Sequence, residues 1–147
     1  TIGREGMAVV WQDGDVIKLQ RWDHDCSQTD GWIVEVYKDN NFWGEAGQSG
    51  LEDAAEVAPG HYAVVWTLNG SVWASVVSEA GEKNATIDAT APVMVNNASG
   101  DYRRRGARIA PGGAANGDVA AVYWTSWKQD GDGWGVFGGL IGLNGTR

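Results

Sequence analysis

The sequence has a single cysteine, three prolines and two histidines in 147 residues, and each scarcity excludes something. One cysteine, Cys26, cannot form a disulfide within the chain. Two histidines, His24 and His61, leave few ways to build a Ser-His-Asp or Cys-His catalytic site. The sequence also lacks a Gly-x-Ser-x-Gly motif and a phosphate-binding loop. We therefore expect a protein that is not an enzyme.

Positive charge and long apolar runs are scarce too. The formal net charge is −8, which disfavours nucleic acid as a partner because a nucleic-acid-binding surface must be basic. The only basic cluster, Arg103-Arg104-Arg105, is interpreted as a solvated loop. No apolar run approaches the ~20 residues of a membrane-spanning helix, so we expect no membrane insertion.

Tryptophan and glycine are abundant instead. The chain has nine Trp beside two Phe, and 22 Gly. Aromatic and β-branched runs separated by glycine-rich turns are typical of all-β domains. Nine indoles are more than a small core hides, so we expect several at the surface, where sugars and protein partners stack on exposed rings.

Three stretches of the sequence are nearly alike. Apolar runs that begin at Gly6, Gly60 and Gly117 end in Trp11, Trp66 and Trp124, and each is followed by a polar turn and a second apolar run. The three tryptophans are 55 and 58 residues apart, and a period of about this length indicates a repeat architecture. We expect one repeat domain covering 1–147, with units of about 1–53, 54–106 and 107–147.

The apolar pattern predicts strands and little helix. The expected strands cover residues 7–12, 15–22, 32–38, 62–67, 71–78, 92–96, 119–125 and 134–141, with a weaker one near Phe42 and Trp43. The dipeptides Asp13-Gly14 and Asn69-Gly70 predict tight hairpin turns. The predicted fold class is all-β, with three four-stranded repeats.

The third unit carries the fullest version of the repeat. It has a Gly-to-Trp run from Gly117 to Trp124, and then Gln-Asp-Gly-Asp-Gly-Trp-Gly-Val-Phe from Gln129 to Phe137. In these residues it resembles the tandem repeats of large secreted and surface proteins, whose copies form β-propeller-like blades. The resemblance covers most of the third unit and the Trp strand and turn of the others. The first unit departs from it after Trp22.

Three blades do not close a ring, since propellers typically have four to eight. The resemblance therefore implies blades completed by oligomerisation, a strategy analogous to that of short oligomeric propeller lectins. A β-trefoil stays open as the alternative, because it also has three four-stranded units and closes within one chain. The triplet Gln20-Arg21-Trp22 is similar to the Gln-x-Trp motif of ricin-type trefoil lectins.

Three clusters combine an aromatic ring with polar side chains, the combination that sugar recognition needs. The first is Trp127, Gln129, Asp130, Asp132 and Trp134; the second is Arg21, Trp22, Asp23 and His24; the third is Trp32, Trp43 and Glu45. The aligned Trp11, Trp66 and Trp124 are assigned to packing instead. No cofactor is expected, although the spacing of Asp130 and Asp132 leaves calcium open.

Three N-glycosylation motifs begin at Asn84, Asn97 and Asn144, each in an expected turn. They favour a secreted glycoprotein. In a secreted protein the odd cysteine, Cys26, suggests a disulfide to another chain or a free thiol.

Taken together, these features predict a secreted, lectin-like protein that binds glycans and is multivalent through its repeats. We expect a homo- or hetero-oligomer. The alternative is a structural or adhesive repeat module that binds protein partners and is linked to them through Cys26.

Overall fold

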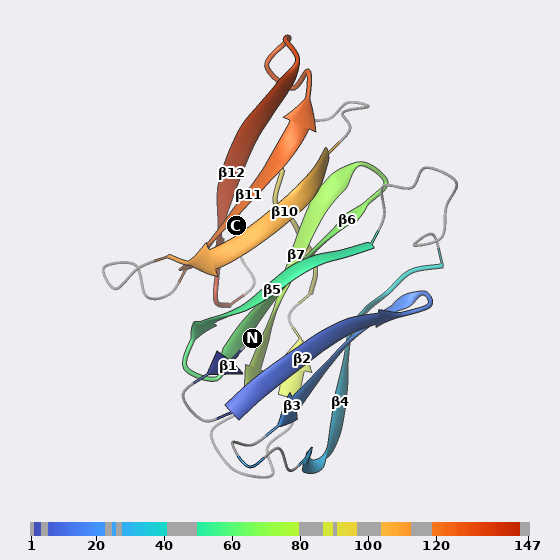
Figure 1. The fold of residues 1–147 in the computed structure, drawn as a ribbon, viewed down its shortest axis with the longest axis vertical. Coiled ribbons are helices and arrows are strands. Elements are labelled where there is room, and N and C mark those ends of the chain that lie inside the picture. Colours follow the sequence, from blue (N-terminus) through green and yellow to red (C-terminus); the bar gives the residue numbers. More distant parts are fainter. Residues whose placement is uncertain are drawn as a thin grey trace.

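The computed structural model describes residues 2–3, 6–22, 25, 28–40, 50–79, 87–89, 91–96, 104–112 and 119–144, and for 2, 3, 6, 28–32, 79 and 87–89 it describes the backbone alone. Within these residues the chain forms strands and turns and no helix (Figure 1). The all-β prediction is thereby confirmed. In the same residues no helix is long and apolar enough to cross a membrane.

The strands form three antiparallel sheets. Sheet 1 contains β1 (Ile2–Gly3), β2 (Gly6–Asp13), β3 (Val16–Trp22) and β4 (Gln28–Lys38), in that order. Sheet 2 contains β5 (Gly50–Ala58), β6 (His61–Leu68), β7 (Ser71–Glu79) and β8 (Ile87–Ala89), with β9 (Val93–Met94) also paired to β7. Sheet 3 contains β10 (Arg104–Pro111), β11 (Val119–Trp127) and β12 (Trp134–Gly142).

Most of the strands lie where the apolar pattern predicts them. The short strands β1 and β8 do not follow from it, and neither do the longer strands β5 and β10. The expected unit boundaries near 53 and 106 fall inside these two strands, so the second and third sheets begin earlier, at Gly50 and Arg104. The expected strand near Phe42 and Trp43 lies outside the described residues. Each sheet nevertheless takes its central hairpin from one of the three repeated stretches.

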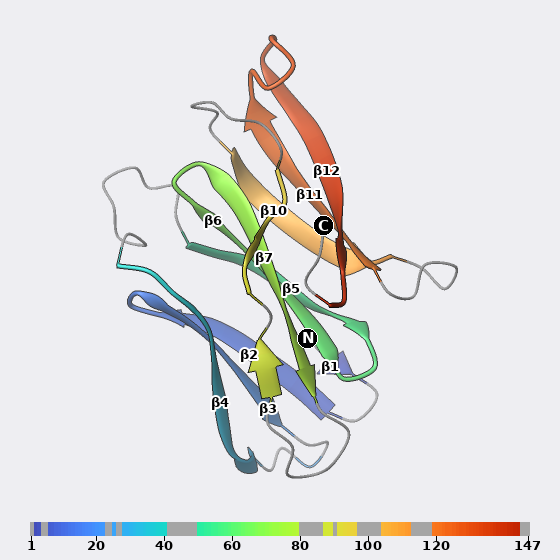
Figure 2. The ribbon, with the colours of Figure 1, turned by 180° about the vertical axis from the view of Figure 1, so that it is seen from behind.

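The three sheets are stacked face to face, with sheet 2 in the middle (Figures 1 and 2). The core between sheets 1 and 2 consists of Ala8, Ile17, Leu19, Val36, Tyr62, Val64, Trp66, Leu68 and Val77. The core between sheets 2 and 3 consists of Val57, Ala63, Val65, Val72, Ala74, Val76, Val95, Ala107, Ile109, Ala120, Val122, Trp124 and Ile141. Sheet 2 therefore contributes both of its faces to hydrophobic cores.

Strand β6 shows why the sequence forms this layer. Successive residues of a strand point to opposite faces, so Val64 and Trp66 pack toward sheet 1 while Ala63 and Val65 pack toward sheet 3. Because both faces are covered, residues 62–68 are all buried. A run that is apolar without alternation is what such a position requires.

The aligned tryptophans occupy equivalent places in the stack. Trp66 of β6 packs toward sheet 1, and Trp124 of β11 packs toward sheet 2. Their exposed fractions are 0% and 3%, which confirms their assignment to packing. Trp11 lies on the face of sheet 1 that points away from sheet 2, and it is only half-buried. We call the face that carries this residue the tryptophan face of each sheet, and the other the receiving face.

Hydrogen bonds between the sheets fix their relative position. The guanidinium of Arg104, 1% exposed, donates to the carbonyl of Gly70 in the β6–β7 turn. The backbone N–H of Ile109 donates to Asp53 Oδ2 (3.2 Å), and that of Leu51 donates to Gln12 Oε1 (3.0 Å). Interpreting the arginine cluster as a solvated loop was therefore wrong for Arg104, a buried residue of a strand.

The hairpin turns follow the expected chemistry in sheet 2 and differ by one residue in sheet 1. Asn69 and Gly70 both have positive φ, 51° and 72°, as a type I′ turn requires. In sheet 1, Asp13 still pairs with Val16, so the turn is Gly14-Asp15 and not Asp13-Gly14. Glycine at the first turn position has φ of 64°.

The stack does not close on itself. A β-trefoil would require strands of all three units to pair in one barrel, whereas in the described part of the chain each strand pairs only within its own sheet. Within these residues the strands therefore do not form a β-trefoil barrel. The three sheets do not complete a ring either, and the outer faces of sheets 1 and 3 form the two ends of the stack (Figure 1).

Candidate functional site

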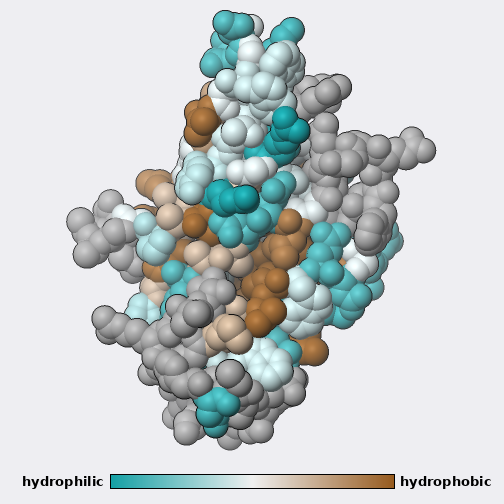
Figure 3. Space-filling model, viewed as in Figure 1, coloured by the Kyte–Doolittle hydropathy of each residue, from teal (hydrophilic) through white to brown (hydrophobic). Residues whose placement is uncertain are grey.

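The third hairpin is longer than the other two. In sheet 1 the hairpin ends at the pair Asp13–Val16. In sheet 2 it ends at Leu68–Ser71, two pairs beyond Trp66. In sheet 3 the ladder runs on past the equivalent pair, Ser126–Gly135, to Trp127–Trp134. The tip of the β11–β12 hairpin therefore projects beyond the stack (Figure 1), and the surface there is hydrophilic, while apolar surface gathers near β5 in the middle of the view (Figure 3).

The added pair places two indoles side by side. Opposite residues of an antiparallel pair share a face, and Trp127 and Trp134 lie on the receiving face of sheet 3. Their ring centroids are 5.5 Å apart and the rings are tilted by 58°. Their exposed fractions are 37% and 45%. The first predicted cluster is thus assembled around two solvent-exposed rings.

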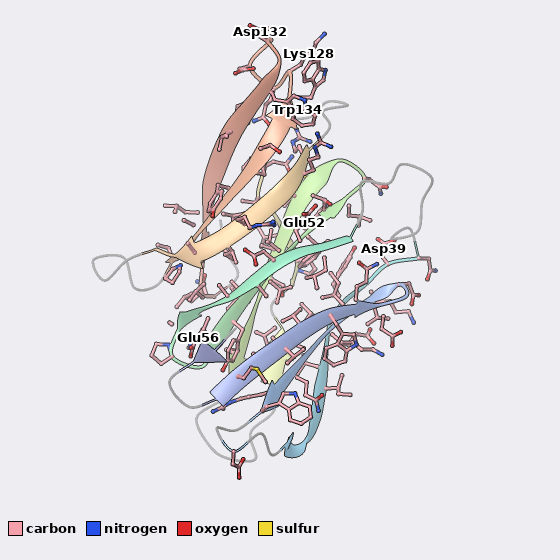
Figure 4. All side chains as sticks on the ribbon, in the orientation of Figure 1. Asp39, Glu52, Glu56, Lys128, Asp132 and Trp134 are labelled. Atoms are coloured by element: carbon pink, nitrogen blue, oxygen red, sulfur yellow. The ribbon has the colours of Figure 1, made fainter. Side chains whose placement is uncertain are left out.

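Two cations flank these rings. Arg105 Cζ lies 4.4 Å from the centroid of Trp134, and Lys128 Nζ lies 5.7 Å from that of Trp127. Both distances are within the range of cation–π attraction. The position of Arg105 is supported from the strand, because its carbonyl accepts a hydrogen bond from Thr125 Oγ1 (2.8 Å). The tip therefore offers N–H donors next to aromatic surface (Figure 4).

The loop that closes the hairpin is held by its own backbone. The N–H of Lys128 donates to the carbonyl of Gly133 (2.6 Å), and the N–H of Gly131 donates to that of Lys128 (3.1 Å). Lys128 adopts φ of 59°, with Gly131 at 96° and Gly133 at 43°. Only glycine takes such conformations at no steric cost. The backbone conformation of the loop is therefore fixed, and it sets the directions of the loop side chains.

Acceptor groups complete the tip. Asp130 and Asp132 are exposed, and Asp130 Oδ1 accepts a hydrogen bond from the backbone N–H of Asp132 (3.3 Å). Gln129 is half-buried. Among the described residues no group of three or more His, Cys, Asp or Glu side chains could hold a metal ion. Chemically, the tip combines ring faces, cationic donors and carboxylate acceptors.

The second predicted cluster is not brought together. Arg21 and Trp22 are consecutive in β3 and point to opposite faces of sheet 1. Arg21 pairs with Ala8 on the face that packs against sheet 2 and is 9% exposed, whereas Trp22 pairs with Met7 on the outer face. A joint sugar site of these two side chains is therefore wrong. Asp23 lies outside the described residues.

The remaining predicted residues are only partly placed. Trp32 belongs to β4, but its side chain is outside the described part. Asn144 is exposed in the turn after β12, as a glycosylation acceptor must be. The other predicted residues lie outside the described residues: His24, Cys26, Trp43, Glu45, Asn84 and Asn97.

Sequence reasoning missed Arg105 as a member of the site. The signal that identifies it is strand alternation, since Arg104 is buried at its position and Arg105 must then point to the opposite face. Arg105 pairs with Thr125 on the same face as Trp134. It was hidden because the strand itself was not predicted.

In the comparisons with known proteins, no family model, no curated protein and no solved structure matches this chain. The geometry of the hairpin tip is therefore the observation from which a function can be inferred.

Proposed function

We propose that the protein is a lectin-like carbohydrate-binding protein and that the tip of the β11–β12 hairpin is a binding site. The observation that carries this is the pair Trp127–Trp134, two exposed indoles with centroids 5.5 Å apart, on an extension that the other two hairpins lack. The pair is not needed to cover the stack. Exposed aromatic rings beside polar side chains are the kind of surface on which a sugar ring can pack.

A sugar would use each part of the tip differently. The C–H face of a pyranose packs on an exposed indole, which supplies area with little loss of side-chain entropy. Its hydroxyl groups take hydrogen bonds from the Arg105 guanidinium and donate them to the carboxylates of Asp130 and Asp132. Charged partners make such hydrogen bonds stronger than neutral ones do.

Avidity would come from several copies of the chain in one assembly, because each chain carries one such tip. We interpret the three sheets as propeller-like blades of one rigid body, supported by their equivalent hairpins and their face-to-face stacking. A single shallow site binds a sugar weakly, and two or more copies of the tip on one assembly bind a multivalent glycan far more tightly. We infer that the protein is secreted, and the exposed acceptor Asn144 is compatible with glycosylation.

A glycan array tests this function directly. We expect the wild-type protein to bind a subset of glycans, Trp134→Ala to lose at least about 10-fold in affinity, and Trp134→Phe to keep part of the binding because a ring remains. Asn40→Ala, at an exposed turn outside the tip and outside both end faces of the stack, is the control and should bind as the wild type does. Absence of binding to every glycan, or equal binding by Trp134→Ala, overturns the proposal.

The second candidate function is a repeat module that binds protein. It is favoured by one observation, the exposed apolar side chains Tyr123, Val136 and Leu140 on the outer face of sheet 3. Non-reducing electrophoresis of the secreted protein would detect a partner linked covalently to Cys26. If the protein runs at the mass of the single chain, the disulfide-linked form of this candidate is wrong.

A further inference from the structure

The two junctions inside the stack are built in the same way. The tryptophan face of sheet 2 packs on the receiving face of sheet 1, through Trp66 and Ile17 among others. The tryptophan face of sheet 3 packs on the receiving face of sheet 2, through Trp124 and Val72 among others. Each sheet thus joins the next through one fixed pair of faces, and the ends of the stack are one tryptophan face and one receiving face.

On the receiving face, the same structural position is buried in two sheets and exposed in the third. Ile17, Val72 and Val136 each follow the hairpin turn at the equivalent pair of the ladder. Ile17 and Val72 are 0% exposed, because the next sheet covers them, whereas Val136 is 75% exposed. Val65 and Tyr123 show the same contrast, at 0% and 46%.

The tryptophan face shows the matching contrast at the other end. Val64 and Val122 lie two residues before the aligned tryptophan and are 0% and 1% exposed. Val9, at that position in sheet 1, is 39% exposed, and Ile33 on β4, which like Val9 pairs with Gln20 of β3, is 54% exposed. Both ends of the stack therefore expose apolar side chains at positions that are core positions elsewhere in the chain, and on the end face of sheet 1 the charges of Lys18 and Asp13 pair with each other.

We propose that these end faces are covered by a second copy of this chain. The receiving face of sheet 3 in one copy takes the tryptophan face of sheet 1 in the other, repeating the junction that the chain already makes twice. In a two-fold dimer both such junctions form at once, and six stacked sheets complete a ring whose size lies within the range of known propellers. The closed assembly leaves no apolar end face.

The proposed dimer contact does not cover the hairpin tip. On the receiving face of sheet 2 the buried position of β7 nearest the turn is Val72, the equivalent of Val136 in sheet 3, and Trp127–Trp134 lies beyond Val136 toward the hairpin tip. The dimer would therefore display two tips. Dimerisation does not depend on carbohydrate binding, because it uses other residues.

Sedimentation equilibrium of the intact chain tests the dimer. We expect twice the chain mass of 15.7 kDa at micromolar concentration. Val136→Asp on the receiving face, or Val9→Asp on the tryptophan face, should each weaken self-association by at least about 100-fold, since an unpaired charge would be buried. Asn40→Asp, which adds the same charge at an exposed turn outside both faces, should leave the dimer intact.

Mixing the two face variants identifies which faces meet. Val136→Asp retains a native tryptophan face and Val9→Asp retains a native receiving face, so the mixture can form one native junction and should recover dimers that neither variant forms alone. Circular dichroism of each variant verifies that it is folded. A monomeric wild-type protein, a series of higher oligomers, or dimers of Val9→Asp alone would each overturn the proposed contact.

Discussion

The two tryptophans inside the stack and the two at the hairpin tip are the same residue in opposite circumstances. Trp66 and Trp124 are 0% and 3% exposed, while Trp127 and Trp134 are 37% and 45% exposed. The inner pair lies where a neighbouring sheet covers the strand, and the outer pair lies on rungs that extend past any neighbour. The face of the strand and the position along the hairpin together therefore decide whether an indole stabilises the fold or is available to a ligand.

The largest expected effect is on stability, because replacing a buried tryptophan should cost far more free energy of unfolding than replacing an exposed one. Trp66→Ala should lower the free energy of unfolding by about 3–5 kcal/mol, because it removes a fully buried ring that stacks on Tyr37 at 4.9 Å. Trp134→Ala should change it by no more than about 0.5 kcal/mol beyond the loss of its contact with Arg105. Urea unfolding followed by circular dichroism measures both, and equal losses would contradict the comparison.

Two consecutive arginines, Arg104 and Arg105, allow the same comparison of a buried and an exposed side chain within one strand. Arg104→Ala should cost about 1.5–3 kcal/mol, because it deletes a buried guanidinium that donates to the carbonyl of Gly70 and joins sheet 3 to sheet 2. Arg105→Ala should cost only about 0.5–1 kcal/mol, the loss of a surface cation–π contact. The same urea titrations report both values, and a more damaging Arg105→Ala would show that the two faces are misassigned.

The smallest effect concerns the phenol that stacks on Trp66. Burial, and then the hydrogen bond and the negative charge of Asp39, raise the pKa of Tyr37 above its ordinary value of 10.0. A raised pKa means that the unfolded chain loses this proton first, so the contribution of Tyr37 to stability is complete below about pH 10 and is lost as the pH rises through the folded-state pKa.

Tyr37→Phe isolates that contribution. At pH 7 the variant should lose about 0.5–1.5 kcal/mol with the hydrogen bond to Asp39 (3.0 Å). Between pH 9 and about 11 its stability should fall less steeply than that of the wild type. Thermal unfolding across this range measures the difference, and parallel pH profiles would refute the assigned environment.

The sequence predicts the central hairpins well because their chemistry is local. The apolar run of β6 and the dipeptide Asn69-Gly70 carry the strand and turn signals in the residues themselves. Strand β5 could not be predicted in this way, because its stretch Leu51-Glu52-Asp53-Ala54 has low β propensity. Its acidic side chains instead take hydrogen bonds from Thr67 and from the backbone of Ile109.

Strand β10 was hidden for a different reason. The register shifts between Arg105 and Arg108, where Gly106 has φ of 64°, and a bulge of this kind breaks the alternation that sequence reasoning looks for. Because strand β10 was not predicted, one residue of the candidate site was not predicted either. Trp127, Asp130 and Trp134 were predicted together because one hairpin joins them, whereas Arg105 reaches them only through the sheet.

Alternation within a strand also explains the failed second cluster. Neighbours in sequence form one site in a loop, as at the hairpin tip, but in β3 they are sent to opposite faces. Arg21 therefore lies on the face of sheet 1 that packs against sheet 2, and Trp22 lies on the outer face.

Fluorine NMR of protein labelled with 5-fluorotryptophan tests the division of the tryptophans most directly. Titration with the oligosaccharide that binds best on the glycan array should shift the resonances of Trp127 and Trp134 and leave those of Trp66 and Trp124 in place. Single Trp→Phe variants assign the resonances. Saturable shifts at the two inner indoles, or none at the tip, would contradict the account.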